Sequence, residues 1–72
     1  MLNINQLQYF VISAEQGSLS KAAEVLYTSQ PHVSKTIKSL ESYLGMELFE
    51  RTPRGVTLSK DGERIYAYAK NL

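Results

Sequence analysis

Residues 17–45 read GSLSKAAEVLYTSQPHVSKTIKSLESYLG and contain two stretches of helical periodicity separated by a short polar break. In the first stretch, apolar residues recur at the spacing of one helix face: Leu19, Ala22, Ala23 and Leu26. Either Ser18 or Ser20 can cap the start of this short helix with its hydroxyl group. The alanines on its inner face allow a second helix to approach closely.

The second stretch predicts a longer helix that begins at about Pro31 and ends before Gly45. Proline is tolerated in a first turn, where the amides have no partner within the helix, and glycine commonly follows a helix end. At about 100° per residue, four apolar residues fall in one narrow stripe: Val33, Ile37, Leu40 and Leu44. The opposite face is polar and basic, and it holds Pro31, Ser34, Lys35, Lys38 and Ser42.

A short helix, a turn at residues 27–29 and a longer helix with a polar outer face form the layout of a helix-turn-helix. In that motif the second helix, here about residues 29–44, enters the major groove of DNA. Short hydroxyl and amide side chains can reach base edges or phosphates there: Ser29, Gln30, Ser34 and Thr36. Lys35 and Lys38 can neutralise phosphates. The alternative is that these are ordinary solvent-facing residues, with Ser29 serving only as a helix cap.

A further helix is expected before this motif, over residues 4–16. Its apolar residues again follow helical spacing: Ile4, Leu7, Phe10, Val11 and Ala14. Asn3 is a candidate cap at its start, and Gly17 is a candidate cap at its end. The chain therefore predicts three helices packed around one core before residue 45.

After Gly45 the pattern changes to that of a hairpin over about residues 48–58. Pro53 and Gly55 fit a tight turn between segments that contain β-branched and aromatic residues. A hairpin beside a helix-turn-helix is a wing, and Arg51 and Arg54 near its tip can lie along the DNA backbone or enter the minor groove. Arg51 has an alternative partner, because Glu47 and Glu50 are close in sequence.

A fourth helix is expected from Ser59 onward, and the chain stops inside it. Ser59 can cap it, and Asp61 and Glu63 lie near its positive end. One side of this helix is apolar, with Ile65, Tyr68, Ala69 and Leu72. A domain of three helices and a hairpin does not fully cover such a stripe, so we expect it to contact a partner.

Composition sets the class of protein but not its function. The chain has 72 residues, of which 43% are hydrophobic and 21% charged, as in an ordinary globular domain. There is no cysteine, and the sequence shows neither a membrane span nor a signal peptide, so we expect a cytoplasmic protein. The net charge is only +1, but the basic residues gather in the second helix of the motif and the wing. Glu41, Glu47 and Glu50 reduce the net positive charge of this stretch. Charge alone therefore does not identify a DNA-binding protein.

Three other functions are weighed against DNA binding. An enzyme would need a nucleophile and base, paired carboxylates or a metal cluster, but His32 is the single histidine and the acids are scattered. We therefore expect no enzymatic activity, no cofactor and no metal site. A winged helix can also serve as a protein interaction module, which would require an apolar outer face on the helix of residues 29–44. A winged helix-turn-helix of a different regulator family is the closer alternative.

The chain resembles the amino terminus of the LysR-type transcription regulators over nearly its whole length. The resemblance is carried, in order and with the family's spacing, by FV at 10–11, GSLSKAA at 17–23, SQPHVSK at 29–35, IKSLE at 37–41, LG at 44–45, LFER at 48–51 and LSKDG at 58–62. It implies a mainly α winged helix-turn-helix, with a three-helix core and a two-stranded wing at residues 1–58. The start of a dimerisation linker helix would follow at residues 59–72.

The resemblance also implies partners. They are a double-stranded DNA operator with an inverted repeat, a second copy bound through the helix of residues 59–72, and a small-molecule inducer that acts only through an effector domain missing here. Base-reading positions of the family fall on Ser29, Gln30, Pro31 and Ser34, phosphate-contacting positions on Lys35 and Lys38, and the wing arginine on Arg54. The dimer positions are Ile65, Tyr68, Ala69 and Leu72.

Three residues depart from the family's pattern. Lys35 stands where arginine is common, which keeps a phosphate contact but loses the bidentate geometry of a guanidinium. His32 replaces a small residue and Thr36 replaces glutamine. We interpret His32 as a direct base contact or an exposed spacer, and Thr36 as a backbone contact, both belonging to this protein's own operator preference.

Overall fold

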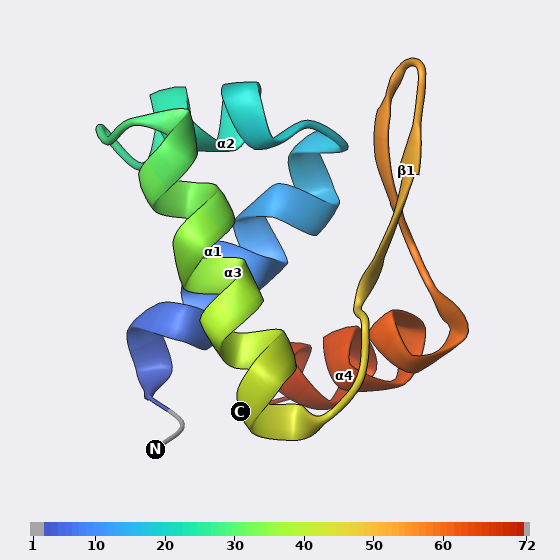
Figure 1. Ribbon diagram of the computed structural model, residues 1–72. Coiled ribbons are helices and arrows are strands. Elements are labelled where there is room, and N and C mark those ends of the chain that lie inside the picture. Colours follow the sequence, from blue (N-terminus) through green and yellow to red (C-terminus); the bar gives the residue numbers. More distant parts are fainter. Residues whose placement is uncertain (1–2, 72) are drawn as a thin grey trace.

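The computed structural model describes residues 3–71 and shows, within them, four helices and an antiparallel hairpin (Figure 1). The elements are α1 (Ile4–Gln16), α2 (Leu19–Val25), α3 (Gln30–Leu44), β1 (Phe49–Thr52), β2 (Gly55–Leu58) and α4 (Lys60–Lys70). The predicted arrangement of three helices, a wing and a fourth helix is confirmed. Leu72, one of the four expected dimer positions, lies outside the described residues.

Each helix begins at a polar side chain that accepts a hydrogen bond from a backbone amide of the first turn. The capping residues are Asn3, Ser18, Ser29 and Ser59, so Ser18 and not Ser20 caps α2. Gly17 and Gly45 end α1 and α3 in the left-handed conformation, with φ of 66° and 71°. The helix limits are therefore set by local chemistry that the sequence displays.

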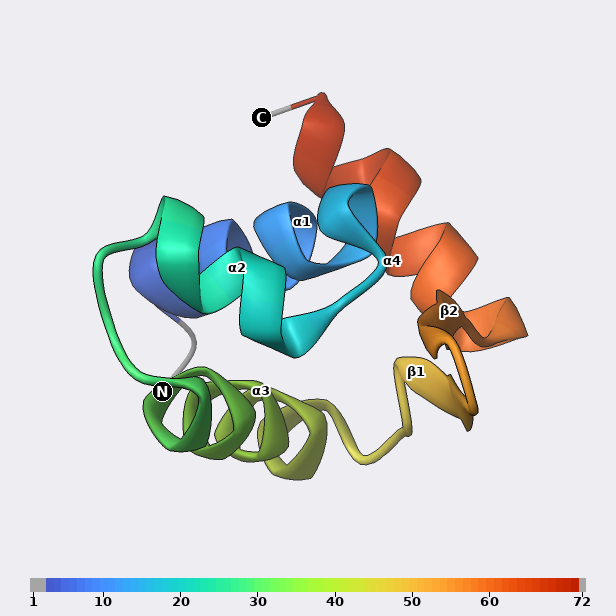
Figure 2. The same ribbon diagram turned by 90° about the horizontal axis from the view of Figure 1, so that it is seen from above.

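The helices α1, α2 and α3 enclose two clusters of apolar side chains. One cluster joins α2, α3 and the hairpin, and consists of Leu19, Ala22, Ala23, Val33, Ile37 and Val56. A second cluster consists of Phe10, Leu40 and Leu48, and α4 packs against it through Ile65 and Tyr66. Figure 2 shows α3 below α1 and α2, with α4 on the far side of α1. The outer face of α3 is thus left uncovered by the rest of the domain.

Two residues of α1 differ from the expected pattern. Ile4 was expected on the inner face, but its side chain is 77% exposed and lines a surface hollow on the side of Ala69. Ser13 is fully buried although it is polar, and its hydroxyl finds no hydrogen-bond partner among the described residues. Helical spacing predicted neither the exposure of Ile4 nor the burial of Ser13, because the burial of a residue depends on the elements that pack against its helix.

The wing is joined to the turn between α1 and α2. In the hairpin, Arg51 lies opposite Val56 and Thr52 opposite Gly55, which leaves Pro53 and Arg54 as the turn. The Val56 amide donates to the Gly17 carbonyl oxygen at 3.1 Å. At Gly55 (φ 142°) a side chain would collide with that same backbone, so only glycine fits. The wing therefore has a fixed position beside α3.

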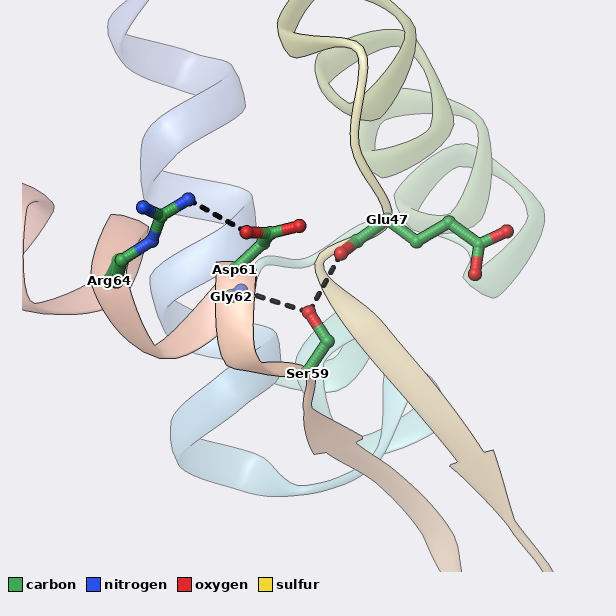
Figure 3. A network of polar contacts seen from close by, with 5 residues as sticks. All are labelled: Glu47, Ser59, Asp61, Gly62 and Arg64. Carbon is green, nitrogen blue, oxygen red and sulfur yellow. Dashed lines mark hydrogen bonds and ion pairs between the residues drawn. The ribbon is translucent and has the colours of Figure 1, made fainter.

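The start of α4 is fixed to the segment that precedes the wing (Figure 3). The Ser59 hydroxyl donates to the Glu47 carbonyl oxygen at 2.7 Å and accepts from the Gly62 amide at 2.9 Å. Arg64 and Asp61 form an exposed ion pair one turn further along, with 2.7 Å between Nη2 and Oδ1. Residues 59–70 consequently share the packed core with the helices that precede them.

One polar network connects the end of α1 to the end of α4. The Tyr66 hydroxyl and the Lys70 ammonium each donate to Glu15 Oε2, at 3.1 Å. These bonds, first the one from Lys70 and then the one from Tyr66, lower the pKa of the Glu15 carboxyl group. The Glu15 carboxylate in turn raises the pKa of Lys70. The network links the end of α4 to the end of α1 at the surface of the domain.

Candidate nucleic-acid interface

The outer face of α3 is a polar surface without carboxylates. It is lined by Pro31, Ser34, Lys35, Lys38, Ser39 and Ser42. These residues face away from the core because Val33, Ile37 and Leu40 occupy the opposite side of the same helix and are buried. On this outer face the ammonium groups of Lys35 and Lys38 stand among short side chains. A polyanion such as DNA can therefore approach the backbone of α3 closely.

The first turn of α3 presents Gln30 and Pro31 to solvent. Ser29 is the helix cap, and its hydroxyl accepts from the His32 amide at 3.2 Å. The Gln30 side chain is exposed and makes no hydrogen bond within residues 3–71, so its amide is free to donate and accept. Ser34 lies one turn further, half-buried, on the side that faces the wing.

His32 and Thr36 lie on the other flank of α3, toward α1. The His32 ring packs edge-on against the Tyr9 ring, with 5.6 Å between the ring centroids. Thr36 Oγ1 donates to the His32 carbonyl oxygen at 2.8 Å, so its hydroxyl already has a partner within the helix. The structure therefore places His32 and Thr36 at the edge of the outer face, beside the residues that line it.

The wing brings both of its arginines to the surface. Arg54 lies in the turn at the tip, and Arg51 lies in β1. Directly opposite residues of an antiparallel pair share a face, so Arg51 points to the same side as Val56, toward α3. Arg51, Lys38 and Ser34 line one hollow between α3 and the wing, together with the carboxylates Glu41 and Glu47. Among the described residues Arg51 makes no ion pair with Glu47 or Glu50.

The expected dimer positions do not form one exposed stripe. Ile65 packs on the Phe10, Leu40 and Leu48 cluster of its own domain. Tyr68 is 65% exposed, whereas Ala69 lines an apolar hollow with residues of α1. Ile65 is therefore half-buried against its own core, and Tyr68 is the most exposed described residue of the set.

Comparison with known proteins places the chain in a family. The model of the bacterial regulatory helix-turn-helix proteins of the lysR family matches residues 4–63. The chain belongs to the LysR family. The resemblance expected from the sequence motifs is thereby confirmed.

Curated relatives of this LysR-family chain are longer regulators. The nitrogen assimilation regulatory protein nac of Klebsiella aerogenes is 39% identical over 71 residues, which are 99% of this chain and 23% of that protein. The HTH-type transcriptional regulator CfxR of Cupriavidus necator is 44% identical over 71 residues, or 99% of this chain and 22% of CfxR. The chain thus spans less than a quarter of the length of these relatives.

Solved structures confirm the winged helix-turn-helix fold. The BenM DNA-binding domain in complex with catB site 1 DNA matches with a TM-score of 0.92 and 38% identity, over 97% of this chain and 75% of that one. The CbnR DNA-binding domain in complex with DNA matches with a TM-score of 0.93 and 36% identity, over 97% and 80% of the two chains.

Sequence reasoning missed one residue that shapes the interface of this LysR-family domain. Glu41 was counted only as a charge that dilutes the basic stretch. In the structure its carboxylate accepts a hydrogen bond from the Leu48 amide at 2.8 Å. This bond closes the loop between α3 and β1 and so fixes the wing relative to α3. The string IKSLE carried Glu41, but periodicity does not reveal its distant partner.

Two other kinds of feature are absent from the described residues. Within residues 3–71, no three acidic or histidine side chains gather closely enough to hold a metal ion. In the same part of the chain, no helix combines the length and apolar character that a membrane crossing requires.

Proposed function

We propose that this chain is the DNA-binding module of a bacterial transcription regulator and binds double-stranded DNA in a sequence-specific manner. Helix α3 would enter the major groove, and the wing of residues 48–58 would lie on the backbone or in the minor groove. The observation that carries this proposal is the carboxylate-free outer face of α3, flanked by a fixed wing with two exposed arginines. The DNA complexes of the BenM and CbnR domains, whose fold this chain shares, support it.

The proposal assigns different tasks to the side chains of α3. Gln30, Pro31 and Ser34 would contact base edges, because they lie on the first turns that reach furthest into the groove. Lys35 and Lys38 would contact phosphates, as would Ser29, whose hydroxyl can donate to a phosphate while its oxygen caps the His32 amide. Arg51 and Arg54 would contact the backbone beside the wing. His32 would contact a base and Thr36 the DNA backbone, both from the edge of the outer face.

The division of the chain and its place in a longer regulator are also proposals. Residues 1–58 would form the DNA-binding domain, and residues 59–72 the start of a linker helix that joins two copies. The relatives are named as transcriptional regulators and not as enzymes, which supports a cytoplasmic regulator without catalytic activity. An inducer would act through a part of the protein beyond these residues.

Selection of bound sequences from a random DNA pool tests the function directly. We expect an enriched inverted repeat, whose two halves are separated by about one helical turn. Gel-shift titration on that sequence should give a log–log dependence of affinity on salt with a slope of about −4 to −7, since two copies of the basic residues displace several counterions. No enrichment together with a slope near zero would refute DNA binding.

A further inference from the structure

A second polar hollow lies between the first turn of α1 and the flank of α3 that faces away from the wing. The side chains around it include Asn5, Gln6, Tyr9, His32, Lys35 and Ser39. Every one of them carries an N–H or O–H donor, and no carboxylate lines the hollow. The hollow between α3 and the wing is different, because Glu41 and Glu47 line it together with its basic residues.

This donor-rich hollow is continuous with the proposed DNA surface. Lys35 and Ser39 line both the hollow and the outer face of α3. The wing stands on one side of α3 and the start of α1 on the other (Figure 1). A molecule that covers the outer face of α3 therefore also covers the mouth of the hollow.

The dimensions of DNA decide what would meet the hollow. A helix with its side chains is about 10–12 Å wide, and the major groove is about 12 Å wide. A helix in the groove consequently has a phosphate backbone along each of its flanks. The wing side of α3 offers Arg51 and Lys38 to one backbone, although Glu41 and Glu47 lie beside them, whereas the other flank offers this hollow without carboxylates.

We propose that the hollow between α1 and α3 binds a backbone phosphate of the strand opposite to the one that the wing contacts. This inference rests on the proposed function, and it extends the interface to α1. Lys35 supplies the positive charge. Gln6 Oε1 accepts from the Asn3 amide at 3.4 Å in the helix cap, which leaves the Gln6 amide hydrogens free to donate. The Tyr9 contact keeps the His32 ring at the rim of the hollow.

A pair of matched substitutions on α1 tests the proposal. Asn5→Asp places a carboxylate at the hollow, where it would repel a phosphate. The same change favours folding, because an acidic residue in the first turn complements the positive end of a helix. Gln8→Glu is the control: it adds the same charge to the same helix, but Gln8 lines the apolar hollow on the side of Ala69.

The readout is affinity for a duplex that carries one half of the enriched repeat, so that contacts between copies play no part. We expect Asn5→Asp to bind about five- to tenfold more weakly, with a salt slope smaller by about 1, and Gln8→Glu to stay within about twofold of the parent. Equal losses for the two variants would overturn the proposal. A parent chain that binds no duplex would instead refute the proposed function itself.

Neutral methylphosphonates, introduced one at a time into the half-site, locate the phosphate. A methylphosphonate at one position on the strand away from the wing should lower the affinity of the parent several-fold. The same substitution should not lower the affinity of the Asn5→Asp variant further, since that variant has already lost the contact. If every position on this strand affects both proteins alike, the hollow holds no phosphate.

Discussion

The α-carbon of Gly62, in the first turn of α4, lies against the carbonyl oxygen of Leu48, and a methyl group at this position would overlap that oxygen. The same carbonyl accepts from the Ser59 amide at 3.0 Å. Backbone therefore packs on backbone where α4 begins, and the close approach explains why a glycine stands inside a helix that would otherwise favour alanine.

Replacing this glycine tests the contact. Gly62→Ala should lower the free energy of unfolding by about 2–3 kcal/mol, because neither Leu48 nor α4 can move without breaking other bonds. Gly45→Ala is the comparison: open space surrounds Gly45, so only its left-handed φ of 71° opposes the change, at a cost of about 1 kcal/mol. Urea denaturation measures both. A Gly62→Ala variant as stable as Gly45→Ala would show that the contact is not tight.

The two kinds of DNA contact should separate in mutants of α3. Gln30→Ala should cost about 1–3 kcal/mol of discrimination at one base pair, because a base-reading amide is lost. Lys38→Ala should weaken cognate and scrambled duplexes alike, since a phosphate contact is independent of sequence. Competition gel shifts with single-base variants of the operator measure this. If both mutants lose cognate and scrambled binding equally, the division of tasks is wrong.

The buried hydroxyl of Ser13 predicts a stabilising substitution. Because Ser13 Oγ has no partner among residues 3–71, its desolvation is uncompensated, and alanine also has the higher helix propensity. Ser13→Ala should raise the free energy of unfolding by about 1 kcal/mol. Ser42→Ala, an exposed serine of α3, should change it by less than about 0.5 kcal/mol. A Ser13→Ala variant that is less stable than the parent would reveal a hidden partner for the hydroxyl.

The network of Glu15, Tyr66 and Lys70 predicts a dependence of stability on pH. Folding lowers the pKa of Glu15 from its ordinary value of 4.5. The contribution of Glu15 to the free energy of unfolding is therefore complete above about pH 4.5 and is lost as the pH falls further. The raised pKa of Lys70 has the opposite consequence, since that contribution is present below pH 10.5 and is lost at higher pH. Glu15→Gln should therefore flatten the acid limb of a plot of melting temperature against pH. Glu24→Gln, on the exposed side of α2, should leave that limb steep.

The position of α4 predicts which of its residues can be changed without unfolding the domain. Tyr68→Glu should reduce binding to a duplex with two half-sites more than binding to one half-site, if two copies meet through α4. Ile65→Glu is unsuitable for this test, because Ile65 is half-buried against the core and its replacement by a charged residue would also lower stability. Gel-shift titrations on both duplexes, with sedimentation equilibrium of the free protein, measure the effect. Equal losses on the two duplexes would exclude Tyr68 from the contact between copies.

The order of the helices and most of their limits follow from the sequence alone. The end of α4 does not, because the pattern predicted a helix that continues to the end of the chain, whereas α4 ends at Lys70 with Asn71 as its cap. The stripe Val33, Ile37 and Leu40 marked the inner face of α3, and all three residues are buried. Asn3, Gly17 and Gly45 marked helix ends, and each occupies its expected cap. These features depend on the chemistry of a few neighbouring residues, which is why a local reading finds them.

Helical spacing could not decide what packs against the flanks of an element. It grouped Ile65 with Tyr68 on one side of α4, but α1 and the Leu48 segment cover the first and leave the second exposed. It did not predict the different neighbours of His32 and Ser34, since Tyr9 lies beside His32 and the wing lies beside Ser34. Which flank a neighbour occupies is a property of the packed structure.

Sequence by itself determined the four helices, the wing and the polar outer face of α3, because periodicity and capping act over a few residues. Only the tertiary structure decided the partner of each distant group. Glu41 bonds to Leu48, Glu15 receives two donors from α4, and the donor-rich hollow forms where α1 meets α3. Such pairs lie up to 55 residues apart in the chain, and packing of apolar side chains brings them together.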